Sequence, residues 1–269
     1  MKLEVLVDNQ SYADQFYLAE PGLSYYIEID KQKILFDTGY SDIIIRNAKE
    51  MGIDLAELNY IVLSHGHNGH TNGLKYLFAH FNLSKAQLVC HPGCFQLKQL
   101  GIHNIGAPFT EDVVKQQIQY HPTKRPYYLS DNCIFLGEIP TIHPFEPRRP
   151  MGKTIINGKE SEDLIMDDSA LVCLTKTGLL IAVGCAHSGI CNIVSYAQQV
   201  TGIQKIAAII GGFHLAEDDP RLPDVIKFFK SQPIDKLYPC HCVSLQAKAD
   251  MLRAGLPVER VGVGLKIDL

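Results

Sequence analysis

The run Ser64-His65-Gly66-His67-Asn68-Gly69-His70 places three imidazoles within six positions, directly after the apolar, strand-like segment 60–63. Imidazole is the commonest protein ligand for divalent transition metals. In an extended segment alternate residues point to the same side, so His65 and His67 share one side, and a turn brings His70 back to it. The spacing therefore predicts a metal site with His65, His67 and His70 as ligands.

Two later strand-like segments also end in candidate ligands. His187 follows the segment 179–183, and His241 follows the segment 236–238. We expect both histidines to add imidazole nitrogens to the same metal site. Cys185 offers a thiolate, which zinc binds well. The alternatives are that Cys185 is a small buried apolar residue and that His187 caps a helix.

Three further polar residues stand where strands end. Asp37 follows the apolar segment 34–36 and is expected to orient a ligating histidine; a simple strand-ending turn is the alternative. His214 follows a pair of glycines and is expected to transfer protons or to hold substrate, unless it is an ordinary hydrogen-bonded histidine. His91 is interpreted as part of a pocket wall.

The amino-acid composition argues against several classes of protein. The chain has 269 residues, of which 46% are hydrophobic and 20% are charged, as in an ordinary globular protein. A net charge of −4 gives no reason to expect a nucleic-acid partner. No apolar run reaches the roughly 18 residues of a membrane span, and the N-terminus lacks a signal-peptide core. With eight cysteines expected to be reduced, these features predict a cytoplasmic protein without a membrane partner.

Hydrophobic periodicity predicts alternating strands and helices in both halves of the chain. The expected strands are 23–29, 33–36, 60–63, 86–90, 170–174, 179–183, 206–210, 236–238 and 258–261. The expected helices are 41–50, about 74–81, 190–200, 223–230 and 243–254. Residues from about 103 to 167 read as irregular. This order indicates an α/β sandwich with the sheets inside and the helices outside.

Several of these motifs, in this order, resemble the metallo-β-lactamase superfamily, and within it the dihydropterin-type synthases. The motifs are Asp37-Thr38-Gly39, the histidine run, Asp167-Asp168-Ser169-Ala170-Leu171, Gly184-Cys185-Ala186-His187-Ser188-Gly189-Ile190, Gly211-Gly212-Phe213-His214-Leu215 and Pro239-Cys240-His241-Cys242. The resemblance implies an αββα sandwich formed by one domain over residues 1–269, with an irregular insertion at about 103–167 that forms a substrate wall.

The resemblance also implies a site for two metal ions. His65, His67 and His187 would hold the first ion, and His70 and His241 the second. The expected cofactor is zinc, as one or two ions, with iron and manganese left open. A metal-activated water would then act as the nucleophile of a hydrolase or related synthase.

Gly69 departs from the family pattern His-x-His-x-Asp-His, because it stands where the family has the aspartate. A glycine has no side chain to ligate a metal, so we expect the second site to be weakened. The alternative function is therefore a non-catalytic or impaired metal-binding relative.

The irregular segment carries basic and aromatic side chains, namely Lys124, Arg125, Arg148, Arg149, Lys153, Tyr127, Tyr128 and Phe145. Guanidinium groups suit phosphate oxygens. We therefore expect a small anionic substrate, phosphorylated and pterin-like, with a solvated basic loop as the alternative. The acidic net charge argues against a nuclease, and a redox role with iron is left open.

Overall fold

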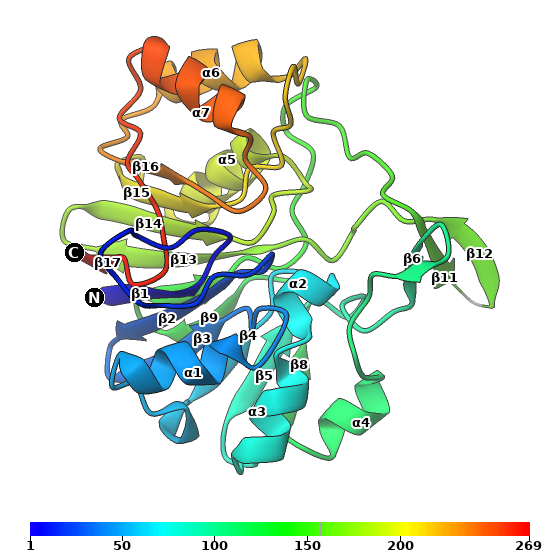
Figure 1. Ribbon diagram of the computed structural model, residues 1–269. Helices are drawn as coiled ribbons and strands as arrows, with labels where there is room; N and C mark the ends of the chain where they lie inside the picture. Colours follow the sequence, from blue (N-terminus) through cyan, green and yellow to red (C-terminus); the bar gives the residue numbers. More distant parts are fainter. Residues whose placement is uncertain (157) are drawn as a thin grey trace.

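The computed structural model describes residues 1–156 and 158–269. Two sheets lie face to face at its centre, and helices cover both outer faces (Figure 1). On one outer face lie α5 (Ile190–Thr201), α6 (Leu222–Ser231) and α7 (Leu245–Arg253). On the other lie α1 (Ile43–Glu50) and α3 (Leu74–His80). The protein is thus the αββα sandwich that the sequence predicts.

The first sheet has seven strands in the order β17-β1-β2-β3-β4-β5-β8. Their bounds are β1 Lys2–Val7, β2 Ser24–Ile29, β3 Gln32–Phe36, β4 Tyr60–Val62, β5 Gln87–Cys90, β8 Gln119–Pro122 and β17 Lys266–Asp268. Strands β2 and β3 pair antiparallel as a hairpin. Its turn residues Asp30 and Lys31 both have positive φ, as a type I′ hairpin turn requires.

The second sheet has six strands in the order β16-β15-β14-β13-β10-β9. Their bounds are β9 Tyr127–Ser130, β10 Cys133–Phe135, β13 Ala170–Thr175, β14 Gly178–Val183, β15 Ile206–Gly211 and β16 Leu237–Pro239. Strands β14, β15 and β16 run parallel, as do β3, β4 and β5 in the first sheet. The segments that follow these six strands therefore gather at one edge of the sandwich.

Residues 103–167 are more regular than the sequence suggests. Strand β8 joins the first sheet and strands β9 and β10 join the second. A separate small sheet, β12-β11-β6-β7, projects from the sandwich (Figure 1); we call it the arm. Its strands are β6 Lys98–Leu100, β7 His103–Asn104, β11 Lys153–Ile156 and β12 Lys159–Glu162, and α4 (Glu111–Lys115) lies between β7 and β8. Strands of two to four residues are too short to show a clear periodicity.

The last predicted strand is wrong. In the segment 258–261 the structure has only an isolated bridge between Leu237 and Val258. The chain instead ends in β17, which pairs antiparallel with β1 at the edge of the first sheet. The helices predicted after the histidine run and in the second half are all present, within two residues at each end. Two short helical turns complete the chain, η1 (Leu55–Glu57) and α2 (Asn68–Thr71).

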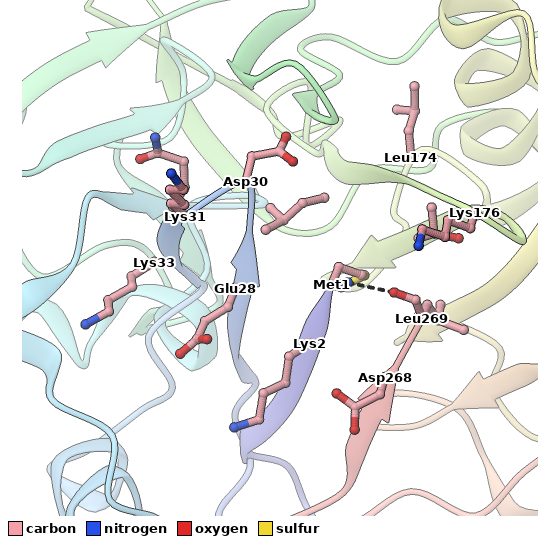
Figure 2. Close-up of a pocket in the computed structure, with 13 residues that line it drawn as sticks. Met1, Lys2, Glu28, Asp30, Lys31, Lys33, Leu174, Lys176, Asp268 and Leu269 are labelled. Carbon is pink, nitrogen blue, oxygen red and sulfur yellow. Dashed lines mark hydrogen bonds between the residues drawn. The ribbon is translucent and has the colours of Figure 1, made fainter.

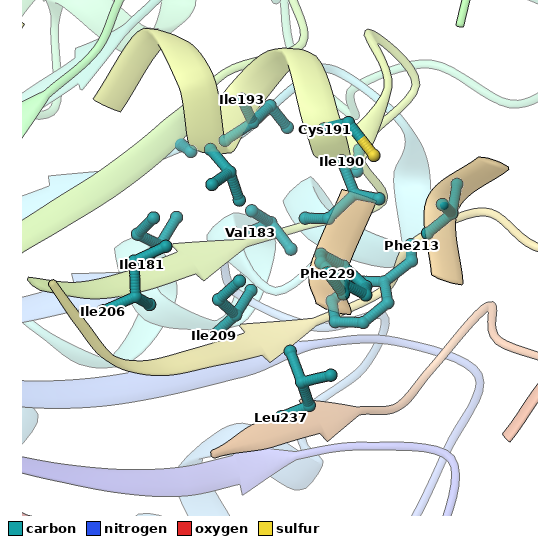
Figure 3. Packing of buried hydrophobic residues seen from close by; sticks show 14 of the residues in the cluster. Ile181, Val183, Ile190, Cys191, Ile193, Ile206, Ile209, Phe213, Phe229 and Leu237 are labelled. Atoms are coloured by element: carbon teal, nitrogen blue, oxygen red, sulfur yellow. The ribbon is translucent and has the colours of Figure 1, made fainter. Parts of the chain in front are cut away.

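Three layers of buried apolar side chains hold the sandwich together. One lies between the two sheets, and one lies under the helices of each outer face. Figure 3 shows the layer beneath α5, where Ile181, Val183 and Ile209 of the sheet face Ile190 and Ile193 of the helix. None of the helices in the described residues is long and apolar enough to cross a bilayer.

Candidate metal centre

Five histidines from three separate segments converge at the edge where the parallel strands end. The Nε2 atom of His65 lies 3.0 Å from the Nδ1 atom of His67. The ring of His187 lies 4.9 Å from each of these two rings. The rings of His70 and His241 lie 5.0 Å apart, and the ring of His70 is 4.2 Å from that of His65. The structure thus brings together all five predicted ligands.

Two triads within this cluster have the spacing of a metal site. One is His65, Cys185 and His187, and the other is His70, Cys185 and His241. In each triad the three ligand atoms lie within 4.8 Å of one another. Cys185 belongs to both triads, and its sulfur is 3.2 Å from the Nε2 atom of His70.

Neighbouring polar groups determine which imidazole nitrogens are free. The Ser64 hydroxyl donates to Asp37 Oδ2, so it accepts from His65 Nδ1 at 2.9 Å. His70 Nδ1 donates to the same Asp37 oxygen at 2.7 Å. His241 Nδ1 donates to the Asn9 side-chain oxygen at 2.8 Å. These three bonds leave the Nε2 lone pairs of His65, His70 and His241 available to a metal.

Asp37 is fully buried behind the histidines, where it also accepts a hydrogen bond from the Ser64 backbone nitrogen at 2.7 Å. Burial raises the pKa of Asp37, and the two Ser64 donors counteract that rise. The carboxylate contacts one ligand of each triad, His70 directly and His65 through Ser64. Its position therefore suits the orienting role proposed from the sequence rather than direct contact with substrate.

Burial keeps the histidines of the cluster neutral. It lowers the pKa of His67 to about 4 and the pKa values of His70 and His241 to about 3. It also lowers the pKa values of His65 and His187 well below their usual range. In the described residues the buried Nε2 atoms of His67 and His187 have no hydrogen-bond partner. Neutral imidazoles with unused nitrogen atoms are the donors that a divalent transition metal binds, so the residues fit such an ion.

Backbone strain is concentrated around the cluster. Asp37, Ala186, His214 and His241 all have φ between +46° and +56°. Residues other than glycine seldom adopt this left-handed conformation, and it is found preferentially at functional sites. The strain therefore marks the strand ends as a functional region.

Comparison with known proteins agrees with this geometry. Residues 18–86 match the family model of the metallo-beta-lactamase superfamily. A protein of Methanocaldococcus jannaschii without a known function is 32% identical over 247 residues, which are 91% of each chain. The chain belongs to the metallo-beta-lactamase superfamily.

Two further similar proteins match almost the whole chain. The 7,8-dihydropterin-6-methyl-4-(beta-D-ribofuranosyl)-aminobenzene-5'-phosphate synthase of Methanocaldococcus jannaschii is 29% identical, over 92% of this chain and 89% of its own. The solved structure of a metal-dependent hydrolase of the beta-lactamase superfamily is 28% identical, with a TM-score of 0.84 over 100% of this chain and 99% of that one. The fold neighbours and the two triads together indicate divalent metal binding.

The pocket over the histidine cluster has a volume of 230 Å³. Four histidines of the cluster line it, namely His67, His70, His187 and His241, and the lining also includes Pro21, Ile105, Met151 and Cys242. His214 also lines the pocket, with its ring 4.4 Å from that of His187, and Arg221 donates to its backbone oxygen. His91 lines a separate pocket of 310 Å³, where its Nε2 atom bonds Glu138.

The basic wall predicted from the sequence does not line this pocket in the described residues. Lys124 pairs with Glu138, and Lys153 pairs with Glu160. Arg148 donates to the backbone oxygens of Ile139 and Ile165. The predicted aromatic groups do not line this pocket either. The Tyr127 hydroxyl donates to Gln87, Tyr128 is exposed, and the ring of Phe145 packs at a tilt against that of His143. Segment 103–167 instead contributes Ile105 and Met151 to the wall.

A larger pocket of 740 Å³ lies between the chain termini and the β2–β3 turn (Figure 2). Its lining mixes cations such as Lys2, Lys31 and Lys33 with anions such as Glu28 and Asp268. It shares no lining residue with the pocket over the histidine cluster.

Sequence reasoning missed several residues that support the cluster. Ser64 stands directly before the first histidine, and this adjacency was the only available signal for its role. Asn9 and Lys98 are remote in sequence from the histidines that they support, and no local pattern marks them. Lys98 is buried and pairs with Asp167, which accepts a hydrogen bond from the Gly66 backbone nitrogen at 2.7 Å.

The metal-free protein is expected to lose stability as the pH falls below about 6.5. The unfolded chain protonates His67, His70 and His241 near that pH, whereas the folded protein does so only near pH 3 to 4. Each histidine thus costs up to about 1.4 kcal/mol per pH unit in this window. Asp168 opposes the trend, because burial raises its pKa to about 6 and the folded state gains that proton first.

Urea unfolding of chelator-treated protein at pH 7.5 and pH 5.5 measures the balance. We expect the free energy of unfolding to be lower at pH 5.5 by a few kcal/mol, since the five histidines of the cluster outweigh Asp37 and Asp168, whose pKa values burial raises. Equal or higher stability at pH 5.5 would contradict neutral burial of the cluster.

Proposed function

We propose that this protein is a metal-dependent hydrolase, or a closely related synthase, that acts on a small anionic substrate. The observation that carries the proposal is the convergence of five neutral histidines in a chain of the metallo-beta-lactamase superfamily. His65, His67 and His187 would hold one ion, and His70 and His241 would hold the other.

A divalent ion bound at such a site would lower the pKa of a water so that it ionises near neutral pH, and the ion would also polarise the bond to be broken. The side chains of this protein perform the remaining tasks. Asp37, Ser64 and Asn9 hold the ligating imidazoles in one tautomer. His214 borders the pocket, and burial lowers its pKa, so at neutral pH it is poised to accept a proton and pass it to a leaving group.

The proposed substrate is phosphorylated and pterin-like. The likeness to the named dihydropterin-type synthase supports the ring system and the phosphate. The apolar side chains of Pro21, Ile105 and Met151 at the pocket provide contacts for a flat heterocycle. Arg149 is exposed near His214, where its charge adds to the effects of burial and of Arg221 in lowering that pKa.

Arg149 is therefore the predicted phosphate ligand among the basic residues of segment 103–167. Arg149→Ala is expected to weaken binding of a phosphorylated ligand by about tenfold or more, because hydrogen bonds to charged groups contribute about 1.5–3 kcal/mol. Isothermal titration with a pterin phosphate and with its dephosphorylated form measures the difference. Arg125→Ala, which removes another exposed arginine, is the control. A similar loss of affinity for both ligands would remove the case for a phosphate contact.

A turnover screen tests the proposed function. The purified protein is stripped, loaded with zinc, iron or manganese, and assayed against phosphodiesters, lactones and thioesters. We expect hydrolysis of at least one anionic substrate class only after metal loading. Turnover that is equal with and without metal, or no turnover with any loaded ion, would refute the proposal.

Gly69 favours a second candidate, an impaired metal-binding relative. A side chain at this position would place its Cβ atom 3.2 Å from the Pro21 backbone oxygen, so a small shift accommodates it. Gly69→Asp is expected to tighten binding of the second ion by about tenfold or more, since even an indirect partner of a metal ligand contributes about 10–100-fold in affinity.

Competition with a chromophoric chelator measures the affinity for each ion, and turnover is followed in parallel. Gly69→Ala is the control, because it adds the Cβ atom without a carboxylate. Equal metal occupancy and equal activity of the parent and Gly69→Asp proteins would show that Gly69 does not impair the second site.

We also propose a cytoplasmic location and a small-molecule partner rather than a nucleic acid or a membrane. The support is the acidic net charge of −4 and eight cysteines that are all unpaired. Free thiols persist in a reducing compartment. A purified protein that is unaffected by a disulfide reductant, and whose number of free thiols falls on exposure to air, would be consistent with that compartment. Disulfides in freshly lysed cells would contradict it.

A further inference from the structure

We propose that the pocket beside His91 is a second small-molecule site, and that its ligand is a small organic cation with an alkyl chain, such as a diamine. The pocket has a volume of 310 Å³, within the range of small-molecule sites. It shares no lining residue with the pocket over the histidine cluster. The inference therefore goes beyond the proposed metal-dependent function and does not rest on it.

The walls of this pocket come from the arm and from the end of β5. His91 and Pro92 directly follow β5, whereas Thr154 lies on β11 and Glu162 on β12. The segment that leads from the arm to β13 completes the lining with Asp163, Leu164, Met166 and Asp167. The pocket thus forms only where the arm meets the sandwich.

An unpartnered hydroxyl in this pocket points to a ligand. Thr154 is only 4% exposed, and its Oγ1 atom has no hydrogen-bond partner in the described residues. A buried hydroxyl without a partner is costly, and most buried polar groups in folded proteins are bonded. Thr154 pairs with Lys98 across the two strands, so both side chains lie on one face of the arm. A donor bound on this face would satisfy the hydroxyl oxygen.

The carboxylates of the lining outnumber the cations that neutralise them. Lys98 lies 3.0 Å from Asp163 and 2.8 Å from Asp167, so one ammonium group serves two buried carboxylates. Glu162 adds an exposed carboxylate to the lining, and Lys153 opposite it on β11 is paired with another glutamate. An excess of negative charge attracts a cationic ligand.

The opposite wall does not restore the balance. Lys124 lies 2.9 Å from Glu138, which neutralises it. His91 adds no charge, because burial lowers its pKa and both of its ring nitrogens are bonded. Its Nδ1 atom accepts from the Gly93 backbone nitrogen, and its Nε2 atom donates to Glu138, each at 3.0 Å. The pocket as a whole therefore disfavours an anion.

A protonated alkyl amine satisfies both the charge and the hydroxyl. An ammonium group has three donors and no acceptor, and a carboxylate offers about four lone-pair sites. Asp163 and Asp167 each accept only two hydrogen bonds in the described residues, so both can accept another. Leu164 and Met166 line the same pocket and offer apolar contacts to the methylene groups of the ligand.

Isothermal titration of the metal-loaded, full-length protein at pH 7 tests the site with three four-carbon probes. Diaminobutane carries an ammonium group at each end, butanediol is its neutral counterpart, and succinate carries two carboxylates. We expect diaminobutane to bind about tenfold or more tightly than the other two, because hydrogen bonds to charged groups contribute about 1.5–3 kcal/mol. At this pH both amines are protonated and have no lone pair for a metal ion.

Two variants locate the bound amine. Thr154→Val removes the hydroxyl at nearly constant volume and is expected to weaken diaminobutane binding by about tenfold. Glu162→Gln removes one charge and is expected to weaken it severalfold. Glu160→Gln is the matched control, since Glu160 lies on the same strand, pairs with Lys153 and does not line the pocket. Thr154→Ser keeps the hydroxyl and should retain the parent affinity, and circular dichroism checks that each variant is folded.

Three results would overturn the proposal. They are no detectable binding of diaminobutane, equal affinity for butanediol, and an affinity for diaminobutane that both Thr154→Val and Glu162→Gln leave unchanged. If Thr154→Val does not fold, the loss in Glu162→Gln against Glu160→Gln decides the location. None of the candidate metal ligands lines this pocket, so failure here would leave the turnover screen and the proposed function unaffected.

Discussion

His187→Ala is expected to lose bound metal and to lower the rate of metal-dependent hydrolysis by about a thousandfold or more. The His187 Nε2 atom is buried without a partner in the described residues, and its ring is 4.9 Å from the rings of both His65 and His67. Removing it leaves the first triad with two members. A metal ion contributes several kcal/mol of transition-state stabilisation, which corresponds to a loss of this size.

Elemental analysis of the purified protein and a turnover assay on the best substrate of the screen measure the two effects. His80→Ala is the control, because His80 is exposed and its ring bonds only the Tyr76 backbone oxygen. It should keep the metal content and the rate of the parent protein. Unchanged metal content in His187→Ala would mean that the histidine cluster does not hold the ion.

Lys98→Met is expected to lower the free energy of unfolding by about 3–5 kcal/mol. Lys98 is only 1% exposed and lies 3.0 Å from Asp163 and 2.8 Å from Asp167. Methionine keeps the volume of the stem but removes the charge. Two buried carboxylates would then face each other without a cation, and such an uncompensated charge is strongly destabilising.

The same substitution is expected to weaken metal binding. Asp167 accepts a hydrogen bond from the backbone nitrogen of Gly66, which lies between His65 and His67. Gly66 is itself confined, because a Cβ atom there would be 2.0 Å from the Cys94 backbone oxygen. Lys98 belongs to β6 of the arm, so the ion pairs join the arm to the histidine run.

Lys153→Met is the matched control, since Lys153 lies on β11 of the same arm and pairs with Glu160 at the surface. Exposed ion pairs contribute about 0–1 kcal/mol, so its loss should be small. The triple variant Lys98→Met, Asp163→Asn and Asp167→Asn should recover part of the stability by removing all three charges. Urea unfolding at pH 7 measures each protein. Equal losses for the two lysine variants would contradict a buried charge network.

The strand and helix order of this fold could be predicted from local sequence, because most elements carry their own signal. Helix α5 is twelve residues long and amphipathic, and β13 and β14 are long apolar strands joined by a short turn. Strands β8 and β17 could not be recognised in the same way. They are four and three residues long, and what makes them strands is the edge of the first sheet to which they bind.

The candidate site likewise has a part that local sequence predicts and a part that it does not. His65, His67 and His70 lie within six positions, so the local conformation of one loop is enough to predict that they act together. The prediction that Arg148 contributes to a basic wall was wrong, because local sequence does not show which groups a side chain contacts. Its charge was visible in the sequence, but its two backbone acceptors come from residues 9 and 17 positions away.

By itself, the sequence determined the alternation of strands and helices and the identity of the candidate ligands, because apolar periodicity and imidazole chemistry are properties of neighbouring residues. Only the tertiary structure decided which nitrogen of each ring is free and that Cys185 belongs to both triads. It also decided that Lys98 contacts the histidine run through Asp167. Those features depend on contacts between residues that are remote in the sequence, such as His70 with Asp37, 33 positions apart, and His241 with Asn9, 232 positions apart. Such contacts exist only after the two sheets have packed face to face and brought the ends of their parallel strands to one edge.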